Sequence, residues 1–258
     1  MRTTFVLLVL TSDLIAKMSA THIKNILPDL HICPRSELQT CLPQSLESMR
    51  SYIAYGIPFL NVPAFEPYYT KFCNITFENN YIAMITFRNT YINGISNYKI
   101  SEVKVSKRNG YITGMIIQFL AHFSFVSVST EFDAYALFEP YTTLTKSSTY
   151  RLSSDLEDVI AQITIGGTNL VNEEENAQYF LVKNVIMRFR EIGHIRTDKQ
   201  EIGNPDDLML LVNHYLKLEW DEVTSELIYK IENTAAVFIQ TISNRIYTSF
   251  PTHMLMTS

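Results

Sequence analysis

The C-terminal stretch, residues 204–250, constrains the fold of this chain most strongly, because its apolar side chains recur at steps of three and four residues. That spacing is the period of one helix face. The apolar positions are Leu208, Leu211, Val212, Tyr215, Val223, Leu227, Ile231, Ala235, Phe238, Ile239, Ile242, Ile246 and Phe250. They predict one amphipathic helix of about 45 residues, roughly 65 Å long at 1.5 Å per residue. A compact domain does not need so long a helix, so another part of the chain must cover its apolar face.

Capping signals indicate where this helix starts and ends. Asn204 is a favoured N-cap residue, Pro205 suits the first helical position, and Asp206 in the first turn complements the helix dipole. Arg245 lies toward the opposite, negative end of the dipole. Because helices longer than 25 residues are uncommon, the alternative is two consecutive helices that break near residues 217–220.

The middle of the chain, residues 72–189, changes to a period of two and is rich in Tyr, Phe, Ile, Val and Thr. This pattern is typical of an antiparallel sheet. Asn109-Gly110 is a strong signal for a two-residue hairpin. The predicted strands include residues 81–87, 103–105, 111–138, 159–165 and 179–189, the fourth of which ends at Gly166-Gly167.

Three of these strands share an irregularity that predicts curvature. Residues 100–103, 156–159 and 182–185 each place two polar residues between apolar ones, which shifts the alternation by one position. Such a shift is what a β-bulge produces, and bulges bend a strand and increase its twist. The alternative is that these pairs are chance turn residues. We therefore expect an α+β fold in which a strongly curved antiparallel sheet wraps around the long C-terminal helix and encloses an apolar tunnel.

The N-terminal residues 1–20 are typical of a secretory signal peptide. Arg2 precedes an apolar run, and small residues end the segment at Ser19 and Ala20. The alternative is a leader that is not cleaved. We expect residues 21–258 to form a single domain, and no run approaches the 18 apolar residues that a spanning helix requires.

Composition excludes one class of partner. The chain is 47% hydrophobic and 18% charged, with a net charge of −5 at pH 7. Nucleic-acid binding normally depends on a basic patch, and no cluster of basic residues exceeds Lys107-Arg108. We therefore expect neither nucleic-acid binding nor stable insertion into a membrane.

The cysteines favour an extracellular protein. Cys33 and Cys41 enclose a short loop, and a disulfide there would stabilise the fold by roughly 2.5 kcal/mol on the loop-entropy model. Cys73 directly precedes Asn74-Ile75-Thr76, an acceptor pattern for N-glycosylation. In a strand, Asn74 and Thr76 would face water and Cys73 would face inward with Ile75 and Phe77, as a buried reduced thiol.

Motifs for catalysis are not found in the sequence. It contains no nucleophile elbow, P-loop, dinucleotide fingerprint or His-Glu-x-x-His helix, and its six histidines are scattered. We therefore expect no enzymatic activity, no cofactor and no metal, with a weak esterase as the least favoured alternative.

Large apolar side chains are abundant, and they predict either an ordinary core or a cavity lined for a ligand. Gln118 and Tyr135 are hypothesised to orient a polar end of such a ligand. The candidate ligand-binding residues are Met84, Met115, Gln118, Phe119, Phe123, Phe125, Tyr135, Phe138, Met187, Leu227, Ile231, Phe238 and Ile242.

Several motifs together resemble one protein family. They are the two cysteines after residues 27–32, the connector Gly56-Ile57-Pro58 with Val62-Pro63 and Glu66-Pro67, the run from Asn93 to Ile100, Trp220, and Asn244-Arg245-Ile246. This set resembles the insect takeout and juvenile hormone binding protein family over nearly the whole mature chain. The chain departs from the family in its extra Cys73 and in its glycine-poor residues 145–155.

The resemblance implies a fold and a function. Family members are secreted carriers with a curved sheet around a long helix and a ligand tunnel, a fold shared with lipid-transfer proteins of the bactericidal permeability type. It also implies the pairing of Cys33 with Cys41. We expect a carrier of a juvenile hormone, another terpenoid or a fatty-acid-like ligand. The alternative is an extracellular recognition module that acts on an unidentified receptor through its surface.

Overall fold

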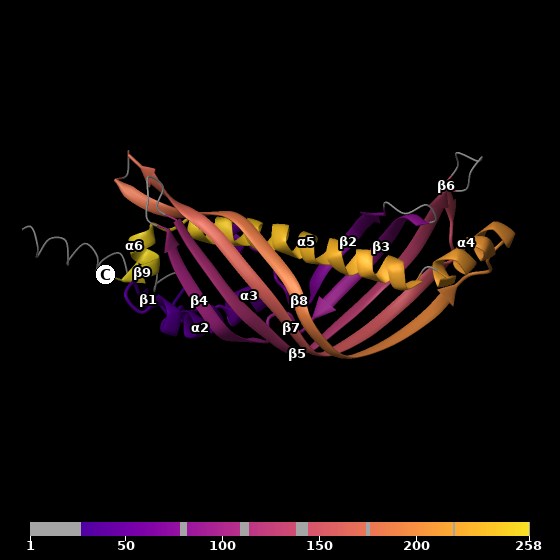
Figure 1. Ribbon diagram of the computed structural model, residues 1–258, viewed down its shortest axis with the longest axis horizontal. Helices are drawn as coiled ribbons and strands as arrows, with labels where there is room; N and C mark the ends of the chain where they lie inside the picture. The colour runs from indigo at the N-terminus through magenta and orange to yellow at the C-terminus, as the bar shows by residue number, and fades with distance from the viewer. Residues whose placement is uncertain are drawn as a thin grey trace, which may run out of the picture.

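A computed structural model describes residues 27–77, 82–108, 114–137, 144–173, 176–218 and 220–257. Residues 1–20, Asn109-Gly110 and Phe138 lie outside the described residues, so the expectations made for them stay predictions. Figure 1 shows a long sheet bent into an arch, with the helix α5 (Trp220–Tyr247) running along its concave side. The expected curved antiparallel sheet around a C-terminal helix is confirmed, but the sheet does not close into a barrel.

The arch is a seven-stranded sheet in which every pair of neighbours is antiparallel. Its strand order is β2-β3-β5-β7-β8, and β4 and β6 also pair with β5. The strands are β2 (Tyr68–Thr76), β3 (Ile82–Asn93), β4 (Tyr98–Arg108), β5 (Gly114–Leu137), β6 (Leu144–Lys146), β7 (Thr149–Asn172) and β8 (Ala177–Ile202). Strands β2, β4, β6 and β8 each pair with one strand only, and β8 forms one edge of the sheet.

The prediction that a strand ends at Gly166-Gly167 is wrong, because β7 continues through both glycines to Asn172. A Cβ atom on Gly167 would lie 2.4 Å from the Phe180 ring and 2.6 Å from the Leu181 carbonyl oxygen. Glycine is present here because the β8 chain passes too closely for any other residue.

Two of the three predicted bulges are confirmed by shifts of register. The pairing of β4 with β5 shifts between Ser101 and Lys104, and Glu102 has a positive φ of 50°. The pairing of β7 with β8 shifts beside Gly166 and Gly167, which leaves Lys183 as the additional residue. Each bulge bends its strand, so the two irregularities contribute to the curvature of the arch.

At the third predicted position the register is continuous, but the backbone is unusual. Asp158 has a positive φ of 52°, and it lies opposite Gly193, on which a Cβ atom would be 3.1 Å from the Asp158 Cβ. The inward-facing positions of β7 also change here, from even numbers at Tyr150 and Leu152 to odd numbers at Val159. We call the line across the sheet through Asp158 and Gly193 the crease.

The C-terminal stretch forms two helices, so the prediction of a single long helix is wrong and the two-helix alternative is correct. Helix α4 (Asp207–Leu218) ends next to Glu219, a residue outside the described part, and Figure 1 shows α4 turning away from the axis of α5. The cap is also displaced by two residues. The Met209 N–H donates to Asp206 Oδ1 at 2.8 Å, so Asp206 caps α4 in place of Asn204.

Polar side chains of α5 bind the open edge of β8. The Val182 N–H donates to Asn244 Oδ1 at 2.8 Å, and Asn244 Nδ2 donates to the Val182 carbonyl oxygen at 3.0 Å. Buried Glu232 accepts the Phe189 N–H at 2.7 Å. Because an edge strand has no neighbour to satisfy these backbone groups, α5 takes the place of the next strand and is fixed over the concave face.

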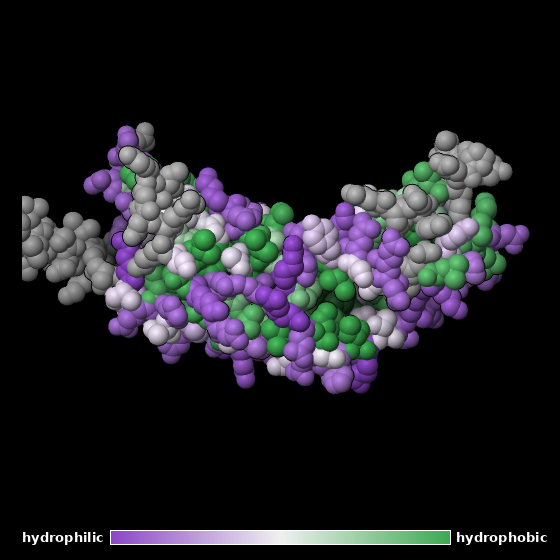
Figure 2. Space-filling view, viewed as in Figure 1, coloured by the Kyte–Doolittle hydropathy of each residue, from purple (hydrophilic) through white to green (hydrophobic). Residues whose placement is uncertain are grey.

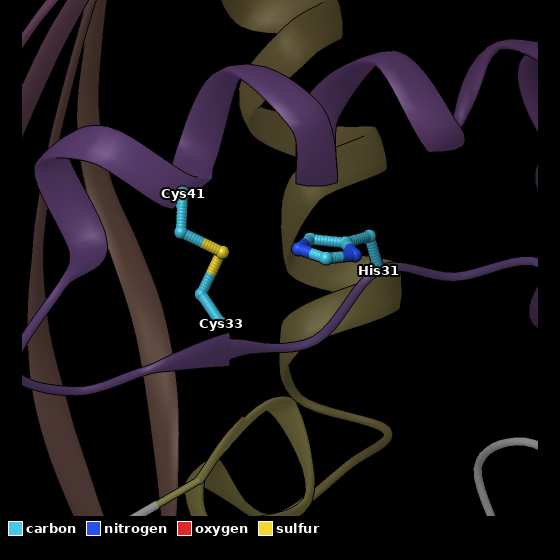
Figure 3. A group of neighbouring side chains, drawn as sticks. All are labelled: His31, Cys33 and Cys41. Atoms are coloured by element: carbon cyan, nitrogen blue, oxygen red, sulfur yellow. A yellow bond between two sulfur atoms is a disulfide. The ribbon is translucent and has the colours of Figure 1, made fainter.

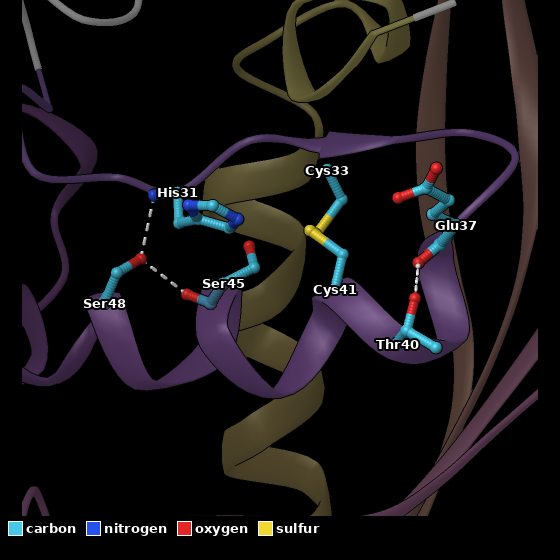
Figure 4. The surroundings of a disulfide bond; sticks show 7 residues. All are labelled: His31, Cys33, Glu37, Thr40, Cys41, Ser45 and Ser48. Atoms are coloured by element: carbon cyan, nitrogen blue, oxygen red, sulfur yellow. Dashed lines mark hydrogen bonds between the residues drawn. A yellow bond between two sulfur atoms is a disulfide. The ribbon is translucent and has the colours of Figure 1, made fainter.

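Described segments from the two ends of the sequence meet at one end of the arch. Strand β1 (Cys33–Pro34) pairs in parallel with β9 (Met256–Thr257), and the disulfide between Cys33 and Cys41 joins β1 to α2 (Leu38–Ser48). Figure 4 shows this disulfide beside a hydrogen bond that ties α2 to the segment before β1, in which the His31 N–H donates to Ser48 Oγ at 2.9 Å. The remaining helical elements are α3 (Arg50–Tyr55), the 3₁₀ turn η1 (Pro58–Leu60) and α6 (Thr252–Leu255). Helix α3 ends at Gly56, whose φ is 78°.

The core is divided into clusters on either side of the crease. The α2-side core contains Val103, Ile117, Phe119, Ala121, Ala161, Ile163, Ile165, Phe180, Val182, Val185, Met187 and Ala236. The α4-side core contains Ile75, Phe77, Ile82, Ile85, Phe132, Ala134, Ala136, Tyr150, Val212, Leu216 and Val223. A third cluster, which includes Leu27, Ile57, Ile242 and Phe250, joins the N-terminal segment to the end of α5. The concave face near the crease lies between the two sheet cores.

Candidate functional site

An apolar row crosses the concave face next to the crease without being fully covered. Val126 of β5 pairs with Leu156 of β7, which pairs with Ile195 of β8. Val126 and Leu156 are partly exposed, and Ile195 is 58% exposed. The row faces inward because it shares the alternation of Phe132 and Leu152, which contact the α4-side core. Valine, leucine and isoleucine side chains are therefore left accessible between two closed cores.

The apolar face of α5 is uncovered at the same level. Val223 near one end of the helix is fully buried and Ile242 near the other is 8% exposed, whereas Ile231 between them is 40% exposed. Leu227 contacts the α4-side core and Ala235 contacts the α2-side core, so Ile231 faces the gap between these cores. Figure 2 shows a hollow with apolar walls near the middle of the arch. We call the surface formed by Val126, Val128, Leu156, Ile195 and Ile231 the crease trough.

Toward α4, a cleft of about 650 Å³ lies between the sheet and the helix. We call it the α4 cleft, and its lining residues are Tyr150, Lys199, Glu201, Leu210, Asn213, Leu216 and Lys217. Burial lowers the pKa of Lys199, and the nearby Glu201 carboxylate opposes this shift. Burial also raises the pKa of the Tyr150 hydroxyl. The site thus combines an apolar trough with a cleft that contains charged groups.

Many of the predicted ligand-binding residues face inward, but they lie in different parts of the concave side. Phe119 and Met187 are buried in the α2-side core, and Met115 and Phe123 contact it. Leu227 contacts the α4-side core, whereas Phe238 and Ile242 belong to the third cluster. Among these predicted residues, Ile231 is the one that lies in the crease trough.

Four predicted residues face the convex side, so the expectation that they line the interior is wrong. Met84 pairs with Thr76, which is exposed, and with Tyr135, whose neighbours Ala134 and Ala136 are the inward residues. Phe125 is 46% exposed, because the crease changes which residues of β5 face inward. Gln118 lines a depression of about 340 Å³, together with the outward residues Gln162 and Arg190.

The sequence interpretation also missed the residues of the trough in the sheet. Val126, Val128, Leu156 and Ile195 were not among the predicted ligand-binding residues. The signal that could have found them is the polar pair Glu157-Asp158, because counting the alternation separately on each side of it places Leu156 on the inner face.

The predicted disulfide is confirmed, whereas Cys73 is a free thiol that is only partly buried and not fully buried as expected. Cys33 and Cys41 form the disulfide, and Cys73 contacts the α4-side core. Burial raises the pKa of the Cys73 thiol, which lowers its reactivity. Asn74 is exposed on β2 and accepts a hydrogen bond from Thr86 Oγ1 at 2.9 Å.

His31 lies beside the disulfide, with one of its ring nitrogens and the two sulfur atoms within 4.8 Å of one another (Figure 3). Cysteine binds metals as the thiolate, and these two sulfur atoms are bonded to each other. The group therefore stabilises the N-terminal segment and provides no thiolate ligands.

Comparison with known proteins identifies the fold and then the family. The crystal structure of Takeout 1 from Epiphyas postvittana superposes with a TM-score of 0.63 at 13% identity, over 89% of this chain and 100% of that chain. The lipopolysaccharide binding protein gives a TM-score of 0.36 at 10% identity, over 86% of this chain and 38% of that chain. The superposition on Takeout 1 shows that the chain has the takeout fold. The sequence model described as haemolymph juvenile hormone binding protein matches residues 6–257, and the chain belongs to this family.

No curated protein sequence matches the chain. Within the described part of the chain, none of the helices combines the length and apolar character needed to cross a membrane.

Proposed function

We propose that the protein is a secreted, non-enzymatic carrier that binds a small hydrophobic molecule in the crease trough beneath α5. The observation that carries this proposal is the uncovered apolar surface of Ile231 and Ile195, which lies between two cores that are otherwise closed. Large apolar side chains that lie on a concave face and stay accessible are typical of a ligand-binding site. A ligand that buries about 400 Å² of apolar area would gain roughly 10 kcal/mol before entropic costs.

The family supports the class of ligand. Its description is a haemolymph protein that binds juvenile hormone, a small apolar molecule. We propose a juvenile hormone, another terpenoid or a fatty-acid-like ligand. An extracellular location is supported by the Cys33–Cys41 disulfide, because disulfides persist in oxidising compartments. The exposed Asn74 is accessible for the proposed glycan.

Binding of a fluorescent fatty-acid probe, followed by displacement with unlabelled apolar molecules, tests the carrier function. We expect Ile231→Glu to weaken binding at least tenfold, because it places a carboxylate in the trough. The matched control is Val237→Glu, since Val237 is an exposed residue of the same helix. Equal affinities of the two variants, or no probe binding by the unmodified protein, would refute the proposal.

A second candidate, a recognition module that acts through its surface, is favoured by the exposed leucines of α4. Leu208, Leu210, Leu211 and Leu218 are all exposed. If the protein bound a receptor equally well with and without a ligand in the trough, and if substitution of these leucines abolished that binding, the module would be the better description.

A further inference from the structure

The α4 cleft differs from the crease trough because charged side chains line it. Lys199, Lys217 and Glu201 surround the cleft, so two ammonium groups face one carboxylate. Glu201 accepts a hydrogen bond from Asn213 Nδ2 at 3.3 Å. The cleft therefore has a positive balance of charge in a protein whose net charge is −5.

Lys199 is held against aromatic rings. Its Nζ atom lies 3.8 Å from the centre of the Tyr150 ring and 5.7 Å from the centre of the Phe132 ring. Both rings belong to the α4-side core, so the ammonium group lies at the border of apolar surface on the concave side. A cation in such a position attracts an anion more strongly than one in open water, because the local dielectric constant is lower.

The cleft lies in line with the crease trough. Ile195, Thr197 and Lys199 alternate along β8 and therefore share the inner face. Four residues of extended strand cover about 13 Å. This is close to the length of a chain of about ten carbon atoms, so one molecule with an apolar body at Ile195 would bring its end to Lys199.

We propose that the α4 cleft binds the carboxylate end of the ligand and that Lys199 is its counter-charge. Long-chain carboxylic acids are then preferred over neutral molecules of the same length. This inference deepens the proposed carrier function and rests on it, because the apolar part of the acid occupies the crease trough.

Laurate and dodecanol test the assignment, because they share a twelve-carbon chain and differ in the charge of the head group. We expect the unmodified protein to bind laurate at least tenfold more tightly than dodecanol by isothermal titration calorimetry. Lys199→Gln is expected to weaken laurate binding about tenfold and to change dodecanol binding less than twofold. Lys199→Arg should restore the preference, since it keeps the positive charge. Lys217→Gln serves as the control for a general loss of positive charge in the cleft.

The outcomes separate the two proposals. Equal affinities for laurate and dodecanol in the unmodified protein, or an equal loss of both in Lys199→Gln, would overturn the head-group assignment and leave the carrier intact. A loss of laurate binding in Lys217→Gln as large as in Lys199→Gln would also overturn the role of Lys199. If neither compound bound, the head-group assignment would be overturned, and the carrier function would fall as well if the fluorescent probe also failed to bind.

Discussion

The side-chain amide of Asn244 pairs with both backbone groups of Val182, accepting from its N–H at 2.8 Å and donating to its carbonyl oxygen at 3.0 Å. Val182 lies next to the β8 bulge at Lys183, on the edge of the sheet. The bulge and the asparagine therefore fix where the end of α5 rests, and with it the position of the apolar helix face above the trough.

We expect Asn244→Leu to lower the free energy of unfolding by about 1–3 kcal/mol, because it leaves the Val182 N–H without its partner and the Val182 carbonyl oxygen with only the bond from Gln240 Nε2 at 3.3 Å. Urea denaturation followed by circular dichroism measures this loss. The control is Asn184→Ala, an exposed asparagine on the same strand, which should change stability by less than about 0.5 kcal/mol. Similar losses in the two variants would contradict the role assigned to Asn244.

A second set of hydrogen bonds joins two of the motifs that resemble the family. The Glu66 carboxylate accepts hydrogen bonds from the Gly94 N–H, the Ser96 N–H and the Ser96 hydroxyl, each at 2.8 Å. Glu66→Ala should cost about 2–4 kcal/mol, because bonds to a charged acceptor are among the stronger ones. Chemical denaturation measures this loss of stability. The control is Glu191→Ala, which removes an exposed carboxylate of β8. An unchanged midpoint for Glu66→Ala would show that the loop does not depend on Glu66.

The disulfide closes a short loop, since Cys33 and Cys41 are separated by eight residues. Replacement of both cysteines by serine should lower the free energy of unfolding by roughly 2.5 kcal/mol through loop entropy. The removal of two buried sulfur atoms from the cluster with Leu38 adds to this loss. Thermal unfolding of the double variant, beside Cys73→Ser as a control without a disulfide, tests the expectation. A double variant as stable as the unmodified protein would contradict it.

Stability should fall in alkaline solution. Burial raises the pKa values of the Cys73 thiol and of Tyr68, Tyr98 and Tyr150, whose ordinary values are 9.0 for cysteine and 10.0 for tyrosine. Above pH 9 the unfolded chain loses these protons while the folded chain keeps them, so the free energy of unfolding decreases with pH. Lys199 acts in the opposite direction, because its pKa is lowered and the folded chain loses that proton first. Because these four groups have raised pKa values and Lys199 is a single group with a lowered one, we expect the net change in stability to be a loss.

Denaturation at pH 7, 9 and 10.5 measures the alkaline loss, and Tyr98→Phe should reduce its slope. Tyr98 donates to the Leu46 carbonyl oxygen at 2.8 Å, so this variant will also be less stable at pH 7. Tyr55→Phe is the control, because Tyr55 is 84% exposed. A stability that stays constant or rises between pH 9 and 10.5 would contradict the sign of the prediction.

The bulges at Glu102 and Lys183 could be predicted from the sequence because a pair of polar residues interrupts an apolar alternation at each of them. The exposure of Asn74 and the inward direction of Ile75 followed from the same two-residue period. These are local properties, and local sequence determines them.

The residues of the trough could not be assigned in the same way. In β5 the run from Phe123 to Val126 has apolar residues on both faces of the sheet, so its own sequence does not show which face turns inward after the crease. That choice depends on Asp158 of the neighbouring strand, whose positive φ changes the alternation in β7. The division of the C-terminal stretch into α4 and α5 likewise depends on how each helix contacts its part of the sheet.

The central claim is that the crease trough binds one apolar molecule, and native mass spectrometry tests it most directly. The folded protein is incubated with an excess of laurate or of a terpenoid ester and its mass is then recorded. We predict that one ligand adds to each chain of the unmodified protein and that Ile231→Glu remains at the mass of the empty chain, while Val237→Glu binds normally. An unmodified protein that keeps the mass of the empty chain with every apolar compound, or an Ile231→Glu variant that binds as well as the Val237→Glu control, would contradict the claim.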